Sequence, residues 1–229
     1  MNKAFFITGT DTGIGKTSIA CALLQAFAAQ GQRVVGMKPV AAGCDDNGLF
    51  DDVLQLQAAS NVQADIAHIN PYRFSPAIAP HIAAEQAGVE ISFASIIAAF
   101  KTLQQQADVV IVEGAGGIAV PLHVTLNGAS NNNVDMADLV LALDIPVILV
   151  VGMRLGCLNQ ALLSAQAIER KGLQFAGWVA NYVTPDMQAA TANEKALLRL
   201  LNAPFLGAIP FSAALPVAAS GYLELARIT

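Results

Sequence analysis

The stretch FFITGTDTGIGKTS, residues 5–18, decides the fold because it joins a strand to a helix through a short glycine-rich loop. The apolar run at residues 4–7 predicts a buried strand, and residues 17–30 carry the apolar stripe of a helix. Glycines in the loop let backbone N–H groups approach phosphate oxygens, and the helix directs its positive end at the anion. Lys16 is then placed to reach the outer phosphates of a nucleotide, and the Thr17 hydroxyl to ligate Mg²⁺.

This loop departs from the strict GxxxxGK[ST] motif at one position. The motif needs glycine at position 10, where the chain has Thr10, and Gly9 lies one residue too early. The alternative is a glycine-rich turn without a ligand, but strand, loop and helix follow in the order that a P-loop requires. We therefore predict that six consecutive residues bind ATP phosphates: Gly13, Ile14, Gly15, Lys16, Thr17 and Ser18.

Composition favours a nucleotide enzyme over a protein that binds nucleic acid or spans a membrane. The 229 residues are 55% hydrophobic and 13% charged, against roughly 25% charged in an average domain. The net charge of −5 and the lack of any Lys/Arg cluster argue against nucleic acid. The longest apolar stretch, Leu139–Gly152, is interrupted by Asp144 and Pro146, which argues against a membrane span.

The N-terminus and the cysteines indicate a cytoplasmic protein. The first strand begins almost at once, without the regions of a signal peptide. Cys21, Cys44 and Cys157 are odd in number and widely spaced, so they predict neither a disulfide framework nor a metal site. We expect them to pack as small apolar residues in a reducing cytoplasm.

Strand patterns alternate with helical patterns along the chain. Besides the first, strands are predicted at 33–37, 108–113, 146–151, 175–180 and 205–209. Helices are predicted at 17–30, from 51, at 92–106, at 134–143, after 156 and at 189–201. Residues 69–81, with three prolines, and the polar residues 121–133 are predicted to be loops. The pattern predicts an α/β fold: one domain, residues 1–229, with a doubly wound, mostly parallel sheet of about seven strands and helices on both faces.

Charged side chains follow strands at the carboxyl edge of this sheet, where open α/β folds bind ligands. Lys38 follows the second strand, and its alternative is a solvated charge. Glu113 comes after four β-branched residues, placed like an acid that holds the nucleotide's Mg²⁺. Asp51 and Asp52 open a helix, where each either caps the helix or reaches the metal. Small residues beside Glu113 allow close approach of a ligand: Gly114, Ala115 and Gly116.

These motifs together resemble the dethiobiotin synthetase family, and the resemblance covers nearly the full chain. The segments that carry it are GTDTGIGKT (9–17), GMKPVAAG (36–43), NPYRF (70–74), APHIAAE (79–85), VEGAGG (112–117), PVILVVGMRLGCLNQA (146–161) and GWVAN (177–181). The GTDT sequence before the P-loop lysine is a trait of that family, which accounts for the displaced glycine. The role of His81 within APHIAAE stays open between a base, a ligand and a packed residue.

The resemblance implies an ATP- and Mg²⁺-dependent ligase of biotin biosynthesis that closes a cyclic urea. The substrate would be 7,8-diaminopelargonate, one amine of which takes up CO₂ as a carbamate. The carbamate would attack the γ-phosphoryl group of ATP, and the second amine would close the ring on the mixed anhydride. The resemblance also implies a cytoplasmic homodimer.

The resemblance further implies roles for individual residues. Lys38 matches the family's active-site lysine and, with Lys16, is a candidate catalytic cation. Alignment on the helix start prefers Asp52 to Asp51, which gives Thr17, Asp52 and Glu113 as Mg²⁺ ligands. Adenine would be bound by Asn181, Pro210 and Phe211. The substrate would contact Thr12, Lys38 and Ala42, and its carboxylate tail would contact Gly156 and Asn159 of a second subunit.

Three positions depart from the family pattern. Ala42 stands where the family often has a substrate-binding serine, so one hydrogen bond is missing. Gly13 stands where some members have glutamate, and Val217 near where some have an acid close to the adenosine. These departures bear on substrate affinity and nucleotide selectivity.

Other nucleotide-binding classes fit the sequence less well. Partitioning ATPases, which act as switches, carry a signature lysine five residues before the P-loop lysine, where this chain has Asp11. Amidotransferase-type ligases of the cobyrinic-acid class need a further glutaminase domain. A GTPase would need an Asn-Lys-x-Asp motif, whereas Asn181 is followed by Tyr182-Val183-Thr184.

Overall fold

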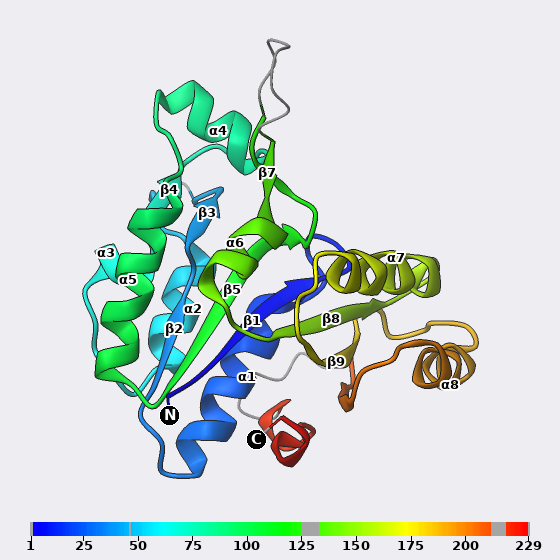
Figure 1. Ribbon diagram of the computed structural model, residues 1–229. Coiled ribbons are helices and arrows are strands. Elements are labelled where there is room, and N and C mark those ends of the chain that lie inside the picture. Colours follow the sequence, from blue (N-terminus) through cyan, green and yellow to red (C-terminus); the bar gives the residue numbers. More distant parts are fainter. Residues whose placement is uncertain (1, 46, 125–132, 212–218, 229) are drawn as a thin grey trace.

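The computed structural model describes residues 2–45, 47–124, 133–211 and 219–228. Six parallel strands form the central sheet in the order β10-β9-β8-β1-β5-β2 (Figure 1). They are β1 (Lys3–Gly9), β2 (Val34–Met37), β5 (Val109–Gly117), β8 (Val147–Met153), β9 (Phe175–Tyr182) and β10 (Phe205–Ile209). The predicted doubly wound fold is confirmed, with six strands in the sheet rather than about seven. The other short strands pair among themselves and do not join it.

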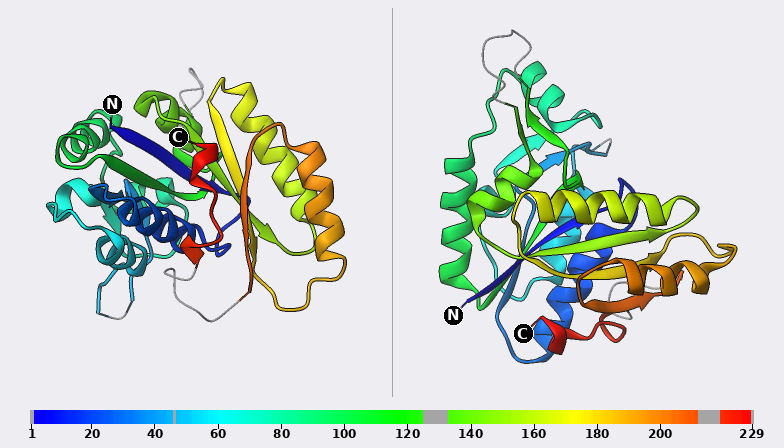
Figure 2. Two further views of the ribbon diagram at one scale, coloured as in Figure 1. Left: turned by 90° about the horizontal axis from the view of Figure 1, so that it is seen from below. Right: turned by 45° about the vertical axis from the view of Figure 1, so that its right-hand side comes forward.

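Helices cover both faces of the sheet, as the continuous apolar runs of its strands require (Figure 2). Successive strand residues point to opposite faces, so Phe5 and Ile7 pack against α1 while Phe6 packs on the other side. Helices α1 (Lys16–Ala29) and α2 (Asp51–Ala59) pack against each other. The face that buries Phe6 is covered by α5 (Phe93–Gln106), α6 (Met136–Leu143), α7 (Cys157–Arg170) and α8 (Ala190–Leu200). A 3₁₀ turn, η1 (Leu225–Arg227), adds Leu225 to the α1 layer.

Two segments that we predicted as loops contain regular structure. Within 69–81, β4 (Tyr72–Phe74) pairs in parallel with β3 (Val40–Ala42), and α4 (Pro80–Ala87) begins at the third proline. Proline is favoured in the first turn of a helix, so its presence there did not exclude one. Within 121–133, β6 (Pro121–His123) pairs antiparallel with β7 (Val134–Asp135), and residues 125–132 lie outside the described part. A short helix, α3 (Ile66–Ile69), was also not predicted.

Strand register brings the predicted site residues to one edge of the sheet. Ile7 of β1 lies opposite Glu113 of β5, and Met37 of β2 lies opposite Val112. Lys38, the residue after Met37, is therefore next to Glu113, and both lie beside the loop that follows β1. Strand β5 continues to Gly117, so Glu113 lies inside the strand rather than at its tip as predicted.

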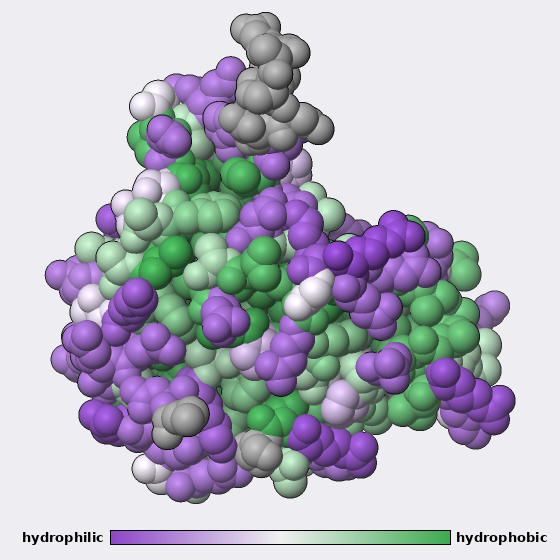
Figure 3. Space-filling view, viewed as in Figure 1, coloured by the Kyte–Doolittle hydropathy of each residue, from purple (hydrophilic) through white to green (hydrophobic). Residues whose placement is uncertain are grey.

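The surface and the cysteines can be compared with the predictions made from composition. In the described residues no helix is both long enough and apolar enough to cross a membrane. On the face seen in Figure 3, hydrophobic side chains form patches that hydrophilic ones separate. Cys21 and Cys157 are buried as expected, and burial raises the pKa of Cys21 to about 12. Cys44 is only half-buried, so its prediction as a packed apolar residue was wrong.

Candidate active site

The loop between β1 and α1 has the backbone conformation that a phosphate-binding loop needs. Gly13 and Gly15 have φ of +70° and +84°, in the left-handed region that favours glycine. A Cβ atom at Gly15 would also lie 2.3 Å from Nδ2 of Asn181. Nδ2 of Asn181 donates to the carbonyl oxygen of Ile14 at 2.7 Å, which ties the loop to the end of β9. The loop therefore presents the N-terminus of α1 in a fixed position.

Lys16, the first residue of α1, is buried, and no carboxylate of the described residues bonds to its ammonium group. Nζ donates to the backbone carbonyl of Asp11 at 2.8 Å. Burial lowers the pKa of Lys16 to about 8, and repulsion from Lys38 acts in the same direction. An anionic ligand in this loop would supply the charge that the ammonium group lacks.

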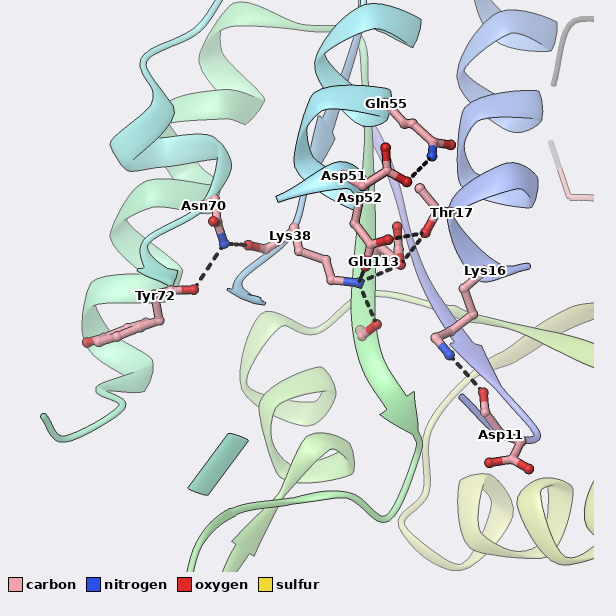
Figure 4. Close-up of polar contacts among 11 residues, drawn as sticks. Asp11, Lys16, Thr17, Lys38, Asp51, Asp52, Gln55, Asn70, Tyr72 and Glu113 are labelled. Atoms are coloured by element: carbon pink, nitrogen blue, oxygen red, sulfur yellow. Dashed lines mark hydrogen bonds and ion pairs between the residues drawn. The ribbon is translucent and has the colours of Figure 1, made fainter. Parts of the chain in front are cut away.

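A second cluster brings together Lys38, Thr17, Asp52 and Glu113 (Figure 4). Nζ of Lys38 is 2.7 Å from Oδ2 of Asp52 and 2.5 Å from Oε1 of Glu113. The Thr17 hydroxyl lies 3.0 Å from Oδ1 of Asp52 and 3.0 Å from Oε1 of Glu113. Lys38 and Glu113 are almost fully buried, whereas Asp52 is half-exposed. Residues from α1, α2, β5 and the end of β2 thus meet at one point.

The charges in this cluster depend on one another. Burial alone would lower the pKa of Lys38, but the carboxylates of Glu113 and Asp52 outweigh it and raise the pKa. Burial would likewise raise the pKa of Asp52, but Lys38 and the Thr17 hydroxyl hold it below its usual value. Burial raises the pKa of Glu113, an effect that Lys38 opposes. Lys38 is therefore a protonated cation whose charge the chain itself balances.

The oxygens of this cluster fit Mg²⁺ bound jointly by protein and phosphate. Two carboxylates and a hydroxyl converge, and Mg²⁺ prefers hard oxygen ligands, commonly one or two carboxylates plus phosphates. Oε2 of Glu113 is buried and has no hydrogen-bond partner among the described residues. Of the two neighbouring acids, Asp52 accepts from Thr17 and Lys38, whereas Asp51 accepts from Gln55 at 2.6 Å. Across the described ranges there is no group of three or more His, Cys, Asp or Glu that would hold a metal without phosphate.

One cavity of about 820 Å³ joins the phosphate loop to this cluster. The predicted residues that line it are Thr12, Gly13, Gly15, Lys16, Thr17, Ser18, Lys38, Ala42, Asp52, Glu113, Ala115 and Gly116. Two other predicted residues, Ile14 and Gly114, are not among the described residues that line it. The Ile14 side chain is buried, and the Gly114 carbonyl lies 3.5 Å from Nζ of Lys38. The phosphate-loop residues and the Lys38 cluster therefore share one site.

Comparison with known proteins shows the family. A family model described as an AAA domain matches residues 3–217. The ATP-dependent dethiobiotin synthetase BioD of Nitrosospira multiformis is 53% identical over 92% of this chain and 89% of its own. That of Xanthomonas euvesicatoria is 48% identical over 99% of both chains. The chain belongs to the dethiobiotin synthetase family.

Solved structures share the fold of this dethiobiotin synthetase family member at low sequence identity. The MinC:MinD cell division complex of Aquifex aeolicus matches with a TM-score of 0.57 and 14% identity, over 92% of this chain and 82% of that one. A ParA family ATPase from Chlorobium tepidum matches with a TM-score of 0.54 and 16% identity, over 92% of this chain and 84% of that one. Likeness at this level shows the fold alone, so it adds no functional support to the partitioning-ATPase alternative.

The residues matched to the family's adenine and carboxylate-tail positions lie outside the main cavity. Pro210 and Phe211 line a separate cavity of about 520 Å³, and the side chain of Asn181 is turned toward Ile14. Gly156 and Asn159 lie at the start of α7, and neither is among the described residues that line the main cavity. Val217 lies outside the described residues. In the described part of the chain, the adenine and tail positions are therefore separate from the site of Lys16 and Lys38.

Sequence reasoning missed two polar residues that support the site in this family member, Asp11 and Asn70. Asp11 supplies the carbonyl for Lys16, and its carboxylate pairs with Arg154. Asn70 is fully buried and donates to the carbonyl of Lys38. Asp11 could have been singled out because it lies within the GTDT motif, and Asn70 because it lies within NPYRF. His81 lines a different cavity, of about 670 Å³.

Proposed function

We propose that the chain is an ATP- and Mg²⁺-dependent ligase that forms the ureido ring of dethiobiotin from 7,8-diaminopelargonate and CO₂. Relatives named ATP-dependent dethiobiotin synthetase, 48–53% identical over most of the chain, support the reaction. The observation that carries the proposal is the shared cavity of Lys16 and Lys38, with Asp52 and Glu113 beside Lys38. It offers cations both to nucleotide phosphate and to a second anion.

The proposed reaction has three steps. A substrate amine adds to the carbon of CO₂ and loses a proton, which gives a carbamate. A carbamate oxygen then attacks the γ-phosphorus of ATP, the bond to the bridging oxygen breaks, and ADP leaves. The second amine attacks the carbamoyl carbon, the carbon–oxygen bond to phosphate breaks, and the ring nitrogen loses its proton. The products are the cyclic urea, ADP and phosphate.

Each lysine has a distinct part in these steps. Lys16 and the backbone N–H groups of residues 13–18 hold the β- and γ-phosphates, because the buried ammonium group donates to a backbone carbonyl rather than to a carboxylate. Lys38 lines the same cavity with a balanced, permanent charge. We assign it to stabilise the negative charge on the carbamate and on the phosphoryl group in transfer. Cations fixed in a buried site before reaction are effective at this.

Thr17, Asp52 and Glu113 are the residues that would hold Mg²⁺. The unpartnered Oε2 of Glu113 and the half-exposed carboxylate of Asp52 are its best anionic ligands in this cluster. When bound, the ion neutralises charge on the β- and γ-phosphates. Lys38 orients both carboxylates, since Nζ donates to one oxygen of each.

The diamine is assigned to the part of the cavity lined by Thr12, Lys38 and Ala42. Its carboxylate tail is assigned to Gly156 and Asn159 of a partner subunit in a cytoplasmic homodimer. Leu155, in the same turn, is a fully exposed apolar side chain that such an interface would cover. Adenine is assigned to Asn181, which contacts the phosphate loop through its hydrogen bond to Ile14, and to Pro210 and Phe211.

The test is incubation with 7,8-diaminopelargonate, bicarbonate, Mg²⁺ and ATP, followed by mass spectrometry. We expect the cyclic urea to appear in equal amount with ADP and phosphate, and to carry the carbon of labelled bicarbonate. ATP hydrolysis without the urea would contradict the proposal. Mixing an inactive Lys16→Ala protein with an Asn159→Ala protein tests the shared site, because a mixed dimer restores one complete site. No gain in activity on mixing would contradict the cross-subunit assignment.

A further inference from the structure

Asn70 lies at the point where the backbone of Lys38 leaves the central sheet. Strand β2 pairs with β5 as far as Met37, so Lys38 is the first residue beyond that ladder. The Lys38 N–H donates to the carbonyl of Ile69 at 2.8 Å. The Lys38 carbonyl accepts from Nδ2 of Asn70 at 2.5 Å (Figure 4). Two consecutive residues, 69 and 70, therefore bond both backbone groups of Lys38.

Asn70 is itself anchored to three neighbouring segments. Its backbone N–H donates to Ile66 of α3 at 2.8 Å, and Nδ2 also donates to the carbonyl of Tyr72 at 3.1 Å. The Tyr72 N–H donates to the carbonyl of Pro39 at 3.1 Å, and its hydroxyl accepts from the N–H of Ser92 at 2.9 Å. Asn70 thus connects the Lys38–Pro39 segment to β4 and to the start of α5.

The hydrogen-bonding capacity of the Asn70 side-chain amide is only partly satisfied. The residue is completely buried, and its Oδ1 has no hydrogen-bond partner in the described part of the chain. Burying an unpaired acceptor is unfavourable, and an apolar residue would avoid that cost. An apolar residue would, however, remove the donor that the carbonyls of Lys38 and Tyr72 share. The two donated bonds are therefore what the amide contributes at this position.

We propose that Asn70 is a positioning residue that fixes the Lys38 backbone, so that Nζ lies between Asp52 and Glu113 at the cavity wall. The proposal rests on the proposed catalytic role of Lys38. A lysine ammonium group hangs on a flexible four-carbon stem, so its place depends on where Cα is held. Small displacements of a catalytic group lower the rate strongly, while substrate binding changes less.

Asn61, which follows α2 and is exposed, offers a control because it bonds the backbone of the same strand. Its Oδ1 accepts from the N–H of Val34 at 2.7 Å, and its Nδ2 donates to the carbonyl of Gln32 at 2.9 Å. Asn61 therefore bonds the backbone at the start of β2, whereas Asn70 bonds it just past the end. Asn61 does not line the cavity. Both side chains support one strand, but only Asn70 bonds the residue that carries the ammonium group.

The first test compares Asn70→Ala with Asn61→Ala by steady-state kinetics and thermal unfolding. We expect both variants to lose stability. Asn70→Ala should lower kcat at least about fivefold with the KM for ATP within about twofold, because misplacement affects the chemical step most. Asn61→Ala should keep kcat within about twofold of wild type. Equal kcat losses in the two variants would overturn the proposal and leave Asn70 a residue of stability alone.

The second test is a double-mutant cycle with Lys38→Met. If Asn70 acts through Lys38, then Asn70→Ala should lower kcat little further once the ammonium group is gone. If the losses of kcat in the two single variants instead multiply in the double variant, the proposal is overturned, while the role of Lys38 is unaffected. Wild-type kcat in Lys38→Met alone would instead contradict the proposed function. Should Asn70→Ala not fold, Asn70→Ser keeps one donor in a smaller side chain. Its kcat should then be reduced, and a wild-type kcat would also overturn the proposal.

Discussion

Lys16 and Lys38 line the same cavity but differ in what surrounds each ammonium group. Nζ of Lys16 donates to the backbone carbonyl of Asp11, and burial lowers its pKa to about 8. Nζ of Lys38 lies within 2.7 Å of carboxylate oxygens of Asp52 and Glu113, and their charges raise its pKa despite burial. Among the described residues, Lys16 therefore has no carboxylate bonded to its ammonium group, whereas Lys38 has two.

We propose that this difference separates nucleotide binding from the chemical step. A buried cation that lacks an anion gains most from a ligand that brings one, which assigns Lys16 to nucleotide phosphate. A cation balanced by the chain keeps its charge and position before any ligand arrives, which assigns Lys38 to charge that develops during reaction. Substitutions at the two positions should therefore change different measured quantities.

The largest effect is expected from Lys16→Ala. The phosphate loop would lose the cation that reaches the β- and γ-phosphates, so turnover should be abolished and ATP affinity should fall at least about a hundredfold. Titration calorimetry with a nonhydrolysable ATP analogue measures that affinity. An affinity within about threefold of wild type would sink the assignment.

Lys38→Met should lower the turnover number rather than the nucleotide affinity. We expect kcat to fall at least about a hundredfold, comparable to the loss of one oxyanion donor. Nucleotide affinity should change little, because the phosphate loop is intact. Steady-state kinetics and calorimetry on one protein sample measure both. If kcat stays at the wild-type value, Lys38 is a structural charge and the contrast between the two lysines disappears.

Glu113→Gln tests the proposed Mg²⁺ site beside Lys38. It removes one anionic oxygen at nearly constant volume, so the Mg²⁺ concentration for half-maximal rate should rise at least about tenfold. Asp52→Asn should behave in the same way, whereas Asp51→Asn should not, because the Asp51 carboxylate accepts from Gln55. Rates measured across a Mg²⁺ titration compare all three. An unchanged Mg²⁺ dependence in Glu113→Gln would remove this residue from the metal site.

Ala42→Ser should give a smaller effect, on substrate binding alone. Ala42 lines the cavity next to the Lys38 segment. A restored hydroxyl should strengthen binding by about 0.5–1.5 kcal/mol, seen as a lower KM for the diamine. The kcat should stay nearly constant, because the contact is equal in ground and transition states. A change in kcat without a change in KM would show that position 42 affects the chemical step instead.

The smallest effect is expected from substitution of Lys171, a lysine that does not line the cavity. Nζ lies 2.6 Å from Asp138, and the pair is partly exposed, so Lys171→Met should cost at most about 1 kcal/mol of unfolding free energy and leave kcat unchanged. Burial alone would raise the pKa of Asp138, but the hydrogen bond from Lys171 holds it below its usual value. The pair therefore adds stability above the unfolded pKa of about 3.9 and loses it as the pH falls through the folded pKa.

Urea unfolding of both proteins at neutral and acid pH checks this. The difference between wild type and Lys171→Met should shrink in acid, and a difference that grows there would contradict the sign.

Much of this arrangement follows from local sequence. Continuous apolar runs such as residues 4–7 and 109–112 predicted buried parallel strands, because such strands are covered on both faces. The parallel direction of those strands then placed Lys38 and Glu113 at one edge before any contact was known. The preference for Asp52 over Asp51 came from alignment and stays a prediction; Asp52 contacts Thr17, whereas Asp51 contacts Gln55.

Long-range pairings could not be predicted in the same way. Strand β4 has three residues between prolines, and its pairing with β3 depends on a neighbour about thirty residues earlier. The role of Asn70 depends on the carbonyl of Lys38, which local propensity does not reveal. The hydrogen bond from the Asn181 side chain to the phosphate loop was likewise not predicted. Side-chain direction at strand ends is set by such tertiary contacts.

The most direct test of the central claim follows oxygen from bicarbonate into phosphate. If a carbamate oxygen attacks the γ-phosphorus, then bicarbonate carrying heavy oxygen must leave one heavy oxygen in each phosphate released during a short incubation. Mass spectrometry of the phosphate measures this. We predict one labelled oxygen per phosphate, in equal amount with the cyclic urea. Phosphate that takes its oxygen from water instead would contradict phosphorylation of a carbamate at this site.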